Sequence, residues 1–138
     1  MAGREEEGAA AVEFALVLPL LLTLVFALID FGVLFGQTLA LNNAAREAAR
    51  QGAVPGLTCA QVKATGQSSA TSIGMTGSAV TPTVSPCPSG EVCSGSVPGQ
   101  ALTVTLTYTH QWLVPIPVPG VPSTYTIRGH GEFRCEYS

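Results

Sequence analysis

Residues 9–36 read AAAVEFALVLPLLLTLVFALIDFGVLFG, and Glu13 and Asp30 are the only charged residues among them. A helix needs roughly 20 apolar residues to cross the hydrocarbon core of a bilayer, which is about 30 Å thick. The uninterrupted apolar run is slightly shorter than this, and its flanking residues extend it to a sufficient length. We predict a transmembrane segment of about residues 14–36. Pro19 lies inside this segment and is expected to kink the helix, because it removes one backbone hydrogen bond.

The sequence after this stretch, QTLALNNAAREAARQGAV, continues the helix without a break. Its apolar residues are spaced for one helical face. The residues of this face are Leu39, Leu41, Ala44, Ala45, Ala48 and Ala49. Gly52 and then Pro55-Gly56 supply stop signals. We therefore predict one long helix over residues 9–52, whose first half lies in lipid and whose second half emerges from it.

A secretory leader that is cleaved off is the alternative interpretation of this N-terminus. The first eight residues, MAGREEEG, carry one Arg against three Glu, whereas such a leader begins with a net positive charge. The apolar stretch also exceeds the usual 7–15 residues of a leader. The nearest small-residue cleavage pattern, Thr38-Leu39-Ala40, lies inside a good helix. These features favour a retained membrane helix.

The composition excludes several classes of function. Charged residues make up 11% of the chain, against about 25% in a typical soluble domain, and the mean hydropathy is +0.37. The net charge is −3 and no basic cluster exists, which disfavours nucleic acid as a partner. The residues after Gly52 contain no Asp and only two histidines. No phosphate loop or zincin motif occurs. We therefore expect a structural protein that is not an enzyme and has no cofactor, metal or small-molecule substrate.

Residues 53–138 are predicted to form a small α+β domain. Thr58 can cap a short helix that extends through about Ile73, and a short strand is expected near residues 79–84. Two longer strands, over residues 102–114 and 125–137, show period-two alternation. Their predicted inner faces are Leu102, Val104, Leu106, Tyr108, His110, Trp112 and Val114, and Tyr125, Ile127, Gly129, Gly131, Phe133, Cys135 and Tyr137.

A proline-rich loop over residues 114–123 separates these two strands, because its prolines cannot continue a central strand. We expect the strands to pair in antiparallel fashion and to cover the emerging helix. His110, beside Trp112 on the apolar face, is expected to be a half-buried ring with its hydrogen bonds satisfied. His130 lies on the polar face and is expected to be solvated.

Four cysteines, Cys59, Cys87, Cys93 and Cys135, all follow the long helix. An even number in a small, weakly charged domain predicts two disulfides that staple the fold. Three pairings are possible, and we favour Cys87 with Cys93 and Cys59 with Cys135. A zinc site is the alternative, but the spacer in CPSGEVC does not suit a zinc knuckle and no histidine is close in sequence.

Glu13 is an acidic residue near the start of an apolar helix. Such a residue costs about 2.5–3.5 kcal/mol at the centre of a bilayer and less near the interface. In one interpretation, Glu13 simply lies at headgroup depth. In the other, cleavage after Gly8 makes Ala9 the new N-terminus, and its ammonium group pairs with Glu13 of an adjacent subunit. Such a pair would neutralise both charges in an apolar filament.

The sequence GAAAVEFALVLPLLL, followed by LNNAAREAARQGA, resembles the TadE-like family of tight-adherence (type IVb, Flp-type) pilus assembly proteins. Members of this family are pilin-like. They have a cytoplasmic leader that a prepilin peptidase cuts after a glycine, a glutamate five residues further on, an apolar helix with a leucine-proline step, and a small extracytoplasmic domain. The resemblance extends over about residues 8–53. It implies cleavage between Gly8 and Ala9, with Glu13 and Leu18-Pro19 as the matching glutamate and step.

The resemblance implies a minor pilin or pseudopilin with a leader over residues 1–8, anchored once in the cytoplasmic membrane with its N-terminus cytoplasmic. The implied partners are membrane lipid, the prepilin peptidase, other pilin subunits and the assembly machinery. The acidic leader departs from the family, because prepilin leaders are typically basic and positive charge favours the cytoplasmic side. The cysteines favour an extracytoplasmic domain. A membrane-anchored extracytoplasmic binding module, whose helix is only a tether, is the alternative function.

Overall fold

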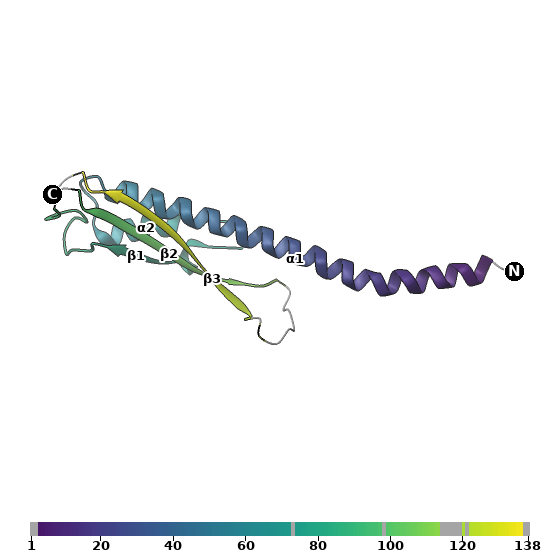
Figure 1. Cartoon of the computed structure of the whole chain (residues 1–138). Coiled ribbons are helices and arrows are strands. Elements are labelled where there is room, and N and C mark those ends of the chain that lie inside the picture. The colour runs from purple at the N-terminus through teal and green to yellow at the C-terminus, as the bar shows by residue number, and fades with distance from the viewer. Residues whose placement is uncertain (1–2, 73, 98, 114–119, 121, 137–138) are drawn as a thin grey trace.

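The structure is a computed structural model that describes residues 3–72, 74–97, 99–113, 120 and 122–136. A long helix, α1, extends from one end of the molecule and packs along a small domain with its second half (Figure 1). The elements are α1 (Gly3–Gly52), α2 (Cys59–Ser69), the short 3-10 helix η1 (Gly77–Ala79), β1 (Thr81–Ser85), β2 (Ala101–Gln111) and β3 (Thr124–Arg134). The predicted α+β fold, with a long apolar helix and a small antiparallel sheet, is confirmed.

The helix α1 is longer than predicted at its N-terminal end, where it begins at Gly3 and not at Ala9. The added residues include three consecutive glutamates. Glutamate is a good helix former, and negative charge is favourable at the N-terminal end of a helix. Pro19 lies inside α1, and the helix continues through it.

The three strands form one antiparallel sheet in the order β1-β2-β3. Opposite residues in β2 and β3 include Leu102 with Phe133 and His110 with Tyr125. The pairing of β2 with β3 confirms the predicted antiparallel arrangement. β1 is an edge strand, a position where a proline such as Pro82 is tolerated because no ladder hydrogen bond is lost on its open side.

Both helices lie on one face of the sheet, with α1 packed mainly on β3 and α2 beside β1 (Figure 1). Leu102, Val104 and Leu106 on the inner face of β2 are fully buried, as the alternation predicts, while the opposite face carries threonines. The core consists of Leu41, Ala44, Ala45, Ala48, Ala49, Val62, Val84, Leu102, Val104, Leu106, Ile127 and their neighbours. The helical face predicted for α1 is therefore confirmed with one exception. Leu39 is 50% exposed, because it lies on the side of the helix that faces away from the sheet.

The predicted inner face of β2 is correct from Leu102 to Leu106, whereas that of β3 is correct in the middle and wrong towards its ends. Tyr125 and Phe133 are 51% and 39% exposed, because the helices cover only the central part of β3. Tyr108 is partly buried and not fully enclosed. Val114 and Tyr137, which were also assigned to these faces, lie outside the described residues.

The helix α2 has Thr58 as its N-cap, as predicted. The Gln61 side-chain oxygen accepts hydrogen bonds from the backbone N–H and the hydroxyl of Thr58, at 2.8 and 2.9 Å. The helix ends at Ser69, four residues before the predicted end, because the backbone of Ala70 leaves the helical conformation with ψ of 62°. Ile73, the predicted end, lies outside the described residues.

All four cysteines form disulfides, but the favoured pairing is wrong. The bonds join Cys59 to Cys87 and Cys93 to Cys135, with Cα atoms 5.5 and 5.7 Å apart. Cys59 begins α2 and Cys87 follows β1, and these two elements pack side by side. Cys93 is buried against the end of α1, where its sulfur lies 3.8 Å from the carbonyl of Gly52, and Cys135 follows β3 at the same end of the domain. Packing thus separates the two cysteines that are closest in sequence.

Candidate functional site

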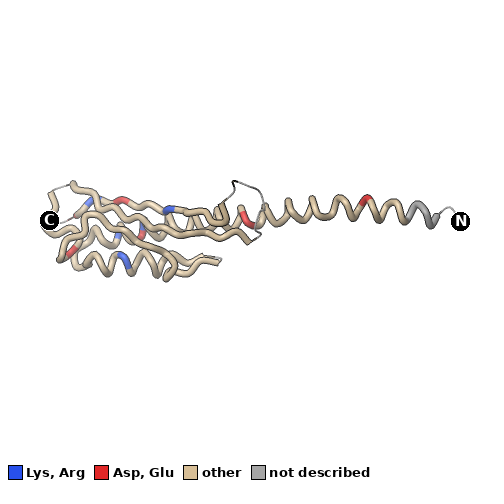
Figure 2. Tube along the Cα trace, turned by 90° about the horizontal axis from the view of Figure 1, so that it is seen from below, with Lys and Arg blue, Asp and Glu red and all other residues tan. Residues whose placement is uncertain are grey.

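The first half of α1 is an apolar surface that nothing in the described chain covers. Among residues 8–29 every residue is exposed except the partly buried Leu18. The most apolar 18-residue stretch of this helix has a mean hydropathy of 2.6, and the helix is long and apolar enough to cross a membrane. Its large exposed side chains include Val12, Phe14, Leu16, Val17, Leu20, Leu21, Leu24, Phe26, Leu28 and Ile29. Figure 2 shows how sparse the charged residues are along this half of the helix.

The residues predicted to carry function at the N-terminus all lie on this exposed half. A side-chain atom added at Gly8 would meet nothing within 4 Å, and Ala9 and Glu13 are exposed. No described residue forms an ion pair or a hydrogen bond with the Glu13 side chain. The Thr23 hydroxyl donates a hydrogen bond to the Pro19 carbonyl at 2.8 Å. The cleavage, the pairing of Glu13 and the kink at Pro19 stay predictions.

Asp30 marks the point at which the exposed half of α1 ends. It is the first buried residue of the helix, with 4% of its surface exposed. Its two carboxylate oxygens accept the backbone N–H of Leu113 at 3.3 and 3.1 Å, and Leu113 lies two residues after the C-terminal end of β2. Asp30 therefore fastens the end of β2 to the helix at this level. A carboxylate buried in this way needs such partners, because desolvation without them is costly.

His110 is the second partner of this carboxylate. Its Nε2 lies 3.4 Å from Asp30 Oδ1, and both side chains are almost fully buried. Its Nδ1 donates a hydrogen bond of 2.8 Å to the side-chain oxygen of Gln37, one of the buried polar residues of α1. The buried Nε2 itself forms no hydrogen bond with a described residue, and its contact with Asp30 is an ion pair only when the imidazole carries a charge.

Trp112 packs against the other side of the imidazole. The two rings meet edge to face with centroids 5.2 Å apart, and the indole N–H donates to the carbonyl of Pro122 at 2.9 Å. The indole therefore ties the two arms of the β2–β3 connection together. His110 is more deeply buried than the half-buried ring that we predicted, with 2% of its surface exposed. Sequence reasoning placed it correctly beside Trp112 but gave it no partner on the helix.

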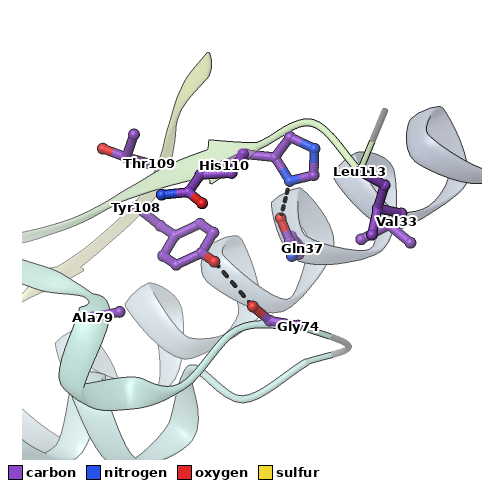
Figure 3. A pocket seen from close by; sticks show the side chains of 9 residues that line it. Val33, Gln37, Gly74, Ala79, Tyr108, Thr109, His110 and Leu113 are labelled. Carbon is purple, nitrogen blue, oxygen red and sulfur yellow. Dashed lines mark hydrogen bonds between the residues drawn. The ribbon is translucent and has the colours of Figure 1, made fainter. Parts of the chain in front are cut away.

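An open pocket of about 430 Å³ lies next to His110 and Gln37, between α1 and the end of β2. Its walls include Val33, Gln37, Tyr108, His110 and Leu113, and Figure 3 shows these side chains around it. The Tyr108 hydroxyl donates to the carbonyl of Gly74 at 3.0 Å and closes one side. The lining combines apolar groups with amide and hydroxyl groups, which suits the binding of an uncharged or weakly polar group. Among the described residues, no group of three or more His, Cys, Asp or Glu could hold a metal ion.

One ion pair lies near the other end of α1. The exposed Arg50 hydrogen-bonds to the partly buried Glu47, with a closest N–O distance of 2.9 Å. This bond, with a smaller contribution from Gln51, lowers the pKa of Glu47 below its ordinary value. The same bond raises the pKa of Arg50. His130 is exposed, as predicted, with Glu132 3.8 Å away. These groups are solvated and form no enclosed site.

The part of α1 that contains its exposed half and Asp30 is also similar to known proteins. Residues 8–50 match the family of TadE-like proteins. The resemblance seen in the sequence is confirmed over this TadE-like segment, which begins at Gly8 and extends almost to the end of α1. No curated protein and no solved structure matches the chain.

Asp30 is the residue of the TadE-like segment whose role sequence reasoning missed. It was counted only as a charge within the apolar run. A signal was present, because Asp30 interrupts an apolar helix and His110 interrupts an apolar strand face. Two ionisable residues that each disrupt an apolar surface are candidates to pair. Their separation of 80 positions in sequence hid the partnership.

Proposed function

We propose that this protein is a pilin-like component of a tight-adherence pilus assembly system, which acts through helix packing and not through chemistry. The observation that carries this proposal is the division of α1 within the TadE-like segment. The half before Asp30 is apolar and exposed, whereas the half after it forms the spine of the domain. A helix divided in this way can hold the subunit in a membrane and later offer the same apolar surface to other subunits.

The dimensions of α1 support a membrane position slightly nearer the N-terminus than the expected residues 14–36. Asp30 is buried, and Val33 and Gln37 also contact the domain. Residues 9–29, about 21 in number, would span roughly 31 Å as a helix, which is close to the thickness of a hydrocarbon core. The protein is then a single-pass protein of the cytoplasmic membrane. Its disulfide-bonded domain lies on the oxidising, extracytoplasmic side and its N-terminus in the cytoplasm.

Processing by a prepilin peptidase follows from this proposal. Cleavage between Gly8 and Ala9 removes the leader and leaves an ammonium group at Ala9, one helical turn from Glu13. The test is intact-mass and N-terminal peptide analysis of the protein after co-expression with an active prepilin peptidase. An N-terminus at Ala9 is the expected result, and co-expression with an inactive peptidase serves as the control. If residues 1–8 are retained beside the active enzyme, the pilin interpretation is wrong.

Glu13 is proposed to pair with the Ala9 ammonium group of a neighbouring subunit. The carboxylate is exposed and has no partner among the described residues, so it is available for such a pair. We expect Glu13→Ala to insert into the membrane normally but to co-purify poorly with the other pilus subunits. Glu132→Ala, which removes an equally exposed glutamate from β3, is the matched control and should behave as wild type. Equal recovery of both variants with the pilus would refute the pairing.

A membrane-anchored binding module is the second candidate function, and the pocket beside Tyr108 favours it. In that case α1 before Asp30 is only a tether. The two functions are distinguished by a chimera in which an unrelated membrane helix replaces residues 9–29. A binding module keeps its function in this chimera, whereas a pilin-like subunit no longer assembles.

A further inference from the structure

The C-terminal end of β2 and the N-terminal end of β3 carry exposed apolar and aromatic groups at the level of Asp30. We call this surface the hairpin tip and define it by Trp112, Leu113, Pro122 and Tyr125. Leu113 is 65% exposed and Tyr125 is 51% exposed. Figure 1 shows this end of the sheet at the end of the domain from which the N-terminal half of α1 extends, where β3 diverges from the helix.

We propose that the hairpin tip is a second membrane-contact surface, which rests on the lipid interface beside the point where α1 leaves the bilayer. The inference rests on the proposed insertion of residues 9–29 in a membrane, but not on a role in pili. The partner of this surface is the bilayer itself, because the backbone of Leu113 is bonded to Asp30, the residue at which the exposed apolar part of α1 ends.

The position of the tip is set by Asp30. The backbone N–H of Leu113 is held by the carboxylate of Asp30, and Ile29, the residue just before Asp30, is still 50% exposed. The hydrogen bond therefore places Leu113 at the depth where the apolar helix ends. It uses only the backbone of Leu113, so the side chain is free to contact lipid.

The chemistry of the tip suits the interface between hydrocarbon and water. No Lys, Arg, Asp or Glu occurs between Glu91 and Arg128 in the sequence, so no charge has to be desolvated when the tip approaches lipid. Trp and Tyr are the residues enriched at membrane interfaces, where an apolar ring and a polar group are both accommodated. Arg128 lies opposite Thr107, several residues away from the tip along the sheet.

The burial of Asp30 and His110 completes this arrangement. The two groups face each other with Nε2 of His110 3.4 Å from Asp30 Oδ1, Gln37 accepts a hydrogen bond from Nδ1 of His110, and the Leu113 N–H donates to Asp30. The ionisable groups nearest the membrane surface are thus enclosed by α1 and β2 and are not presented to the lipid. The exposed residues that remain around them, such as Leu113, Gln111 and Thr124, are apolar or uncharged.

The test uses Trp112, which is the only tryptophan of the chain. The full-length protein is reconstituted in phosphatidylcholine vesicles with and without lipids that carry bromine atoms on their acyl chains, which quench nearby tryptophans. We expect brominated lipid to quench a large part of the Trp112 emission. Absence of quenching would overturn the proposal. This holds even if the emission wavelength shows that the indole is shielded from water, because an indole that brominated lipid does not quench is covered by protein and not by lipid.

Two reporter variants separate this proposal from the insertion of the helix. Trp112→Phe combined with Phe26→Trp places the reporter in the apolar helix, where strong quenching is expected. Trp112→Phe combined with Val97→Trp places it before β2, which is 11 residues long, and so about 35 Å further from the tip, where quenching should be absent. Quenching at position 26 but not at Trp112 refutes only the tip contact. Absence of quenching at both positions refutes membrane insertion as well.

A charge substitution tests whether the tip itself makes the contact. Leu113→Glu keeps the backbone N–H that Asp30 accepts but makes the exposed side chain unfavourable in lipid. We expect this variant to lose most of the Trp112 quenching. Val97→Glu changes an equally exposed side chain at the far end of the domain and should leave the quenching unchanged. Undiminished quenching in Leu113→Glu would mean that Trp112 is near lipid only because α1 is, and would overturn the proposal.

Discussion

The close packing of α1 on β3 depends on a glycine, and replacing it gives a sharp prediction. Gly131 lies in β3 directly against the backbone of α1. A Cβ atom added there would overlap the carbonyl group of Ala45 and the N of Arg46. These are backbone atoms of a helix, which cannot rotate away as a side chain can. The helix and the strand would have to move apart by on the order of 1 Å to restore normal carbon contacts.

The expected cost follows from two opposing effects. Overpacking of this kind costs about 1–3 kcal/mol, whereas replacing glycine by alanine stabilises the folded state by about 0.4–1 kcal/mol through the unfolded chain. The net destabilisation of Gly131→Ala is therefore about 1–2 kcal/mol. For a domain of this size, that difference lowers Tm by roughly 5–15 °C.

The assay is thermal unfolding of the full chain in detergent micelles with its disulfides intact, followed by the fluorescence of Trp112. Gly90→Ala is the matched control, because a Cβ at Gly90 meets nothing within 4 Å and no positive φ is required there. The control should unfold at the wild-type temperature or slightly above it. If Gly131→Ala and Gly90→Ala unfold at the same temperature, α1 does not lie on β3 as described.

Three further predictions concern the core, the cysteines and the surface. Leu41→Ala should destabilise the domain by about 2–5 kcal/mol because Leu41 is fully buried, whereas Leu39→Ala, at a half-exposed position of the same helix, should change Tm little; equal effects would contradict the assigned helical face. Peptide mapping without reduction should recover Cys59 linked to Cys87 and Cys93 linked to Cys135. A peptide that links Cys87 to Cys93 would show that α2 and β1 do not pack as described. The lowered pKa of Glu47 adds stability above the ordinary carboxyl pKa, and this contribution is lost as the pH falls through the lowered value. Between pH 7 and pH 3, Tm should therefore fall slightly less in Glu47→Gln than in wild type, and an identical fall would mean that the pair with Arg50 does not contribute.

Much of the fold could be predicted from the sequence because periodicity is a local property. The alternation around Leu102, Val104 and Leu106 indicated a strand with one buried face, and these residues are buried in β2. Likewise, the alanine spacing after Gly36 indicated the face of α1 that meets the sheet. The errors in β3 are found where the helices no longer cover the strand, as at Tyr125 and Phe133, since a pattern does not tell how far a neighbouring element extends.

The pairing of the cysteines and the contacts of Asp30 with His110 and Leu113 could not be predicted from periodicity. The short spacer between Cys87 and Cys93 favoured a local bond, but the positions of α2 and β1 bring Cys59 to Cys87 instead. Asp30 and His110 are far apart in sequence, and the residues around each of them do not indicate that the two are in contact. Which ends of two elements meet depends on how the elements pack together.

By itself, the sequence determined that a helix of about residues 14–36 is apolar and long enough to cross a membrane, because almost all of its side chains are apolar. It also determined the TadE-like character of that helix. Only the tertiary structure decided where the exposed half ends, because the burial of Asp30 requires the Leu113 N–H and His110, which the antiparallel pairing of β2 and β3 brings to the helix. The boundary between the apolar helix and the folded domain is thus set by long-range hydrogen bonds, which cannot be predicted from the hydropathy of the sequence.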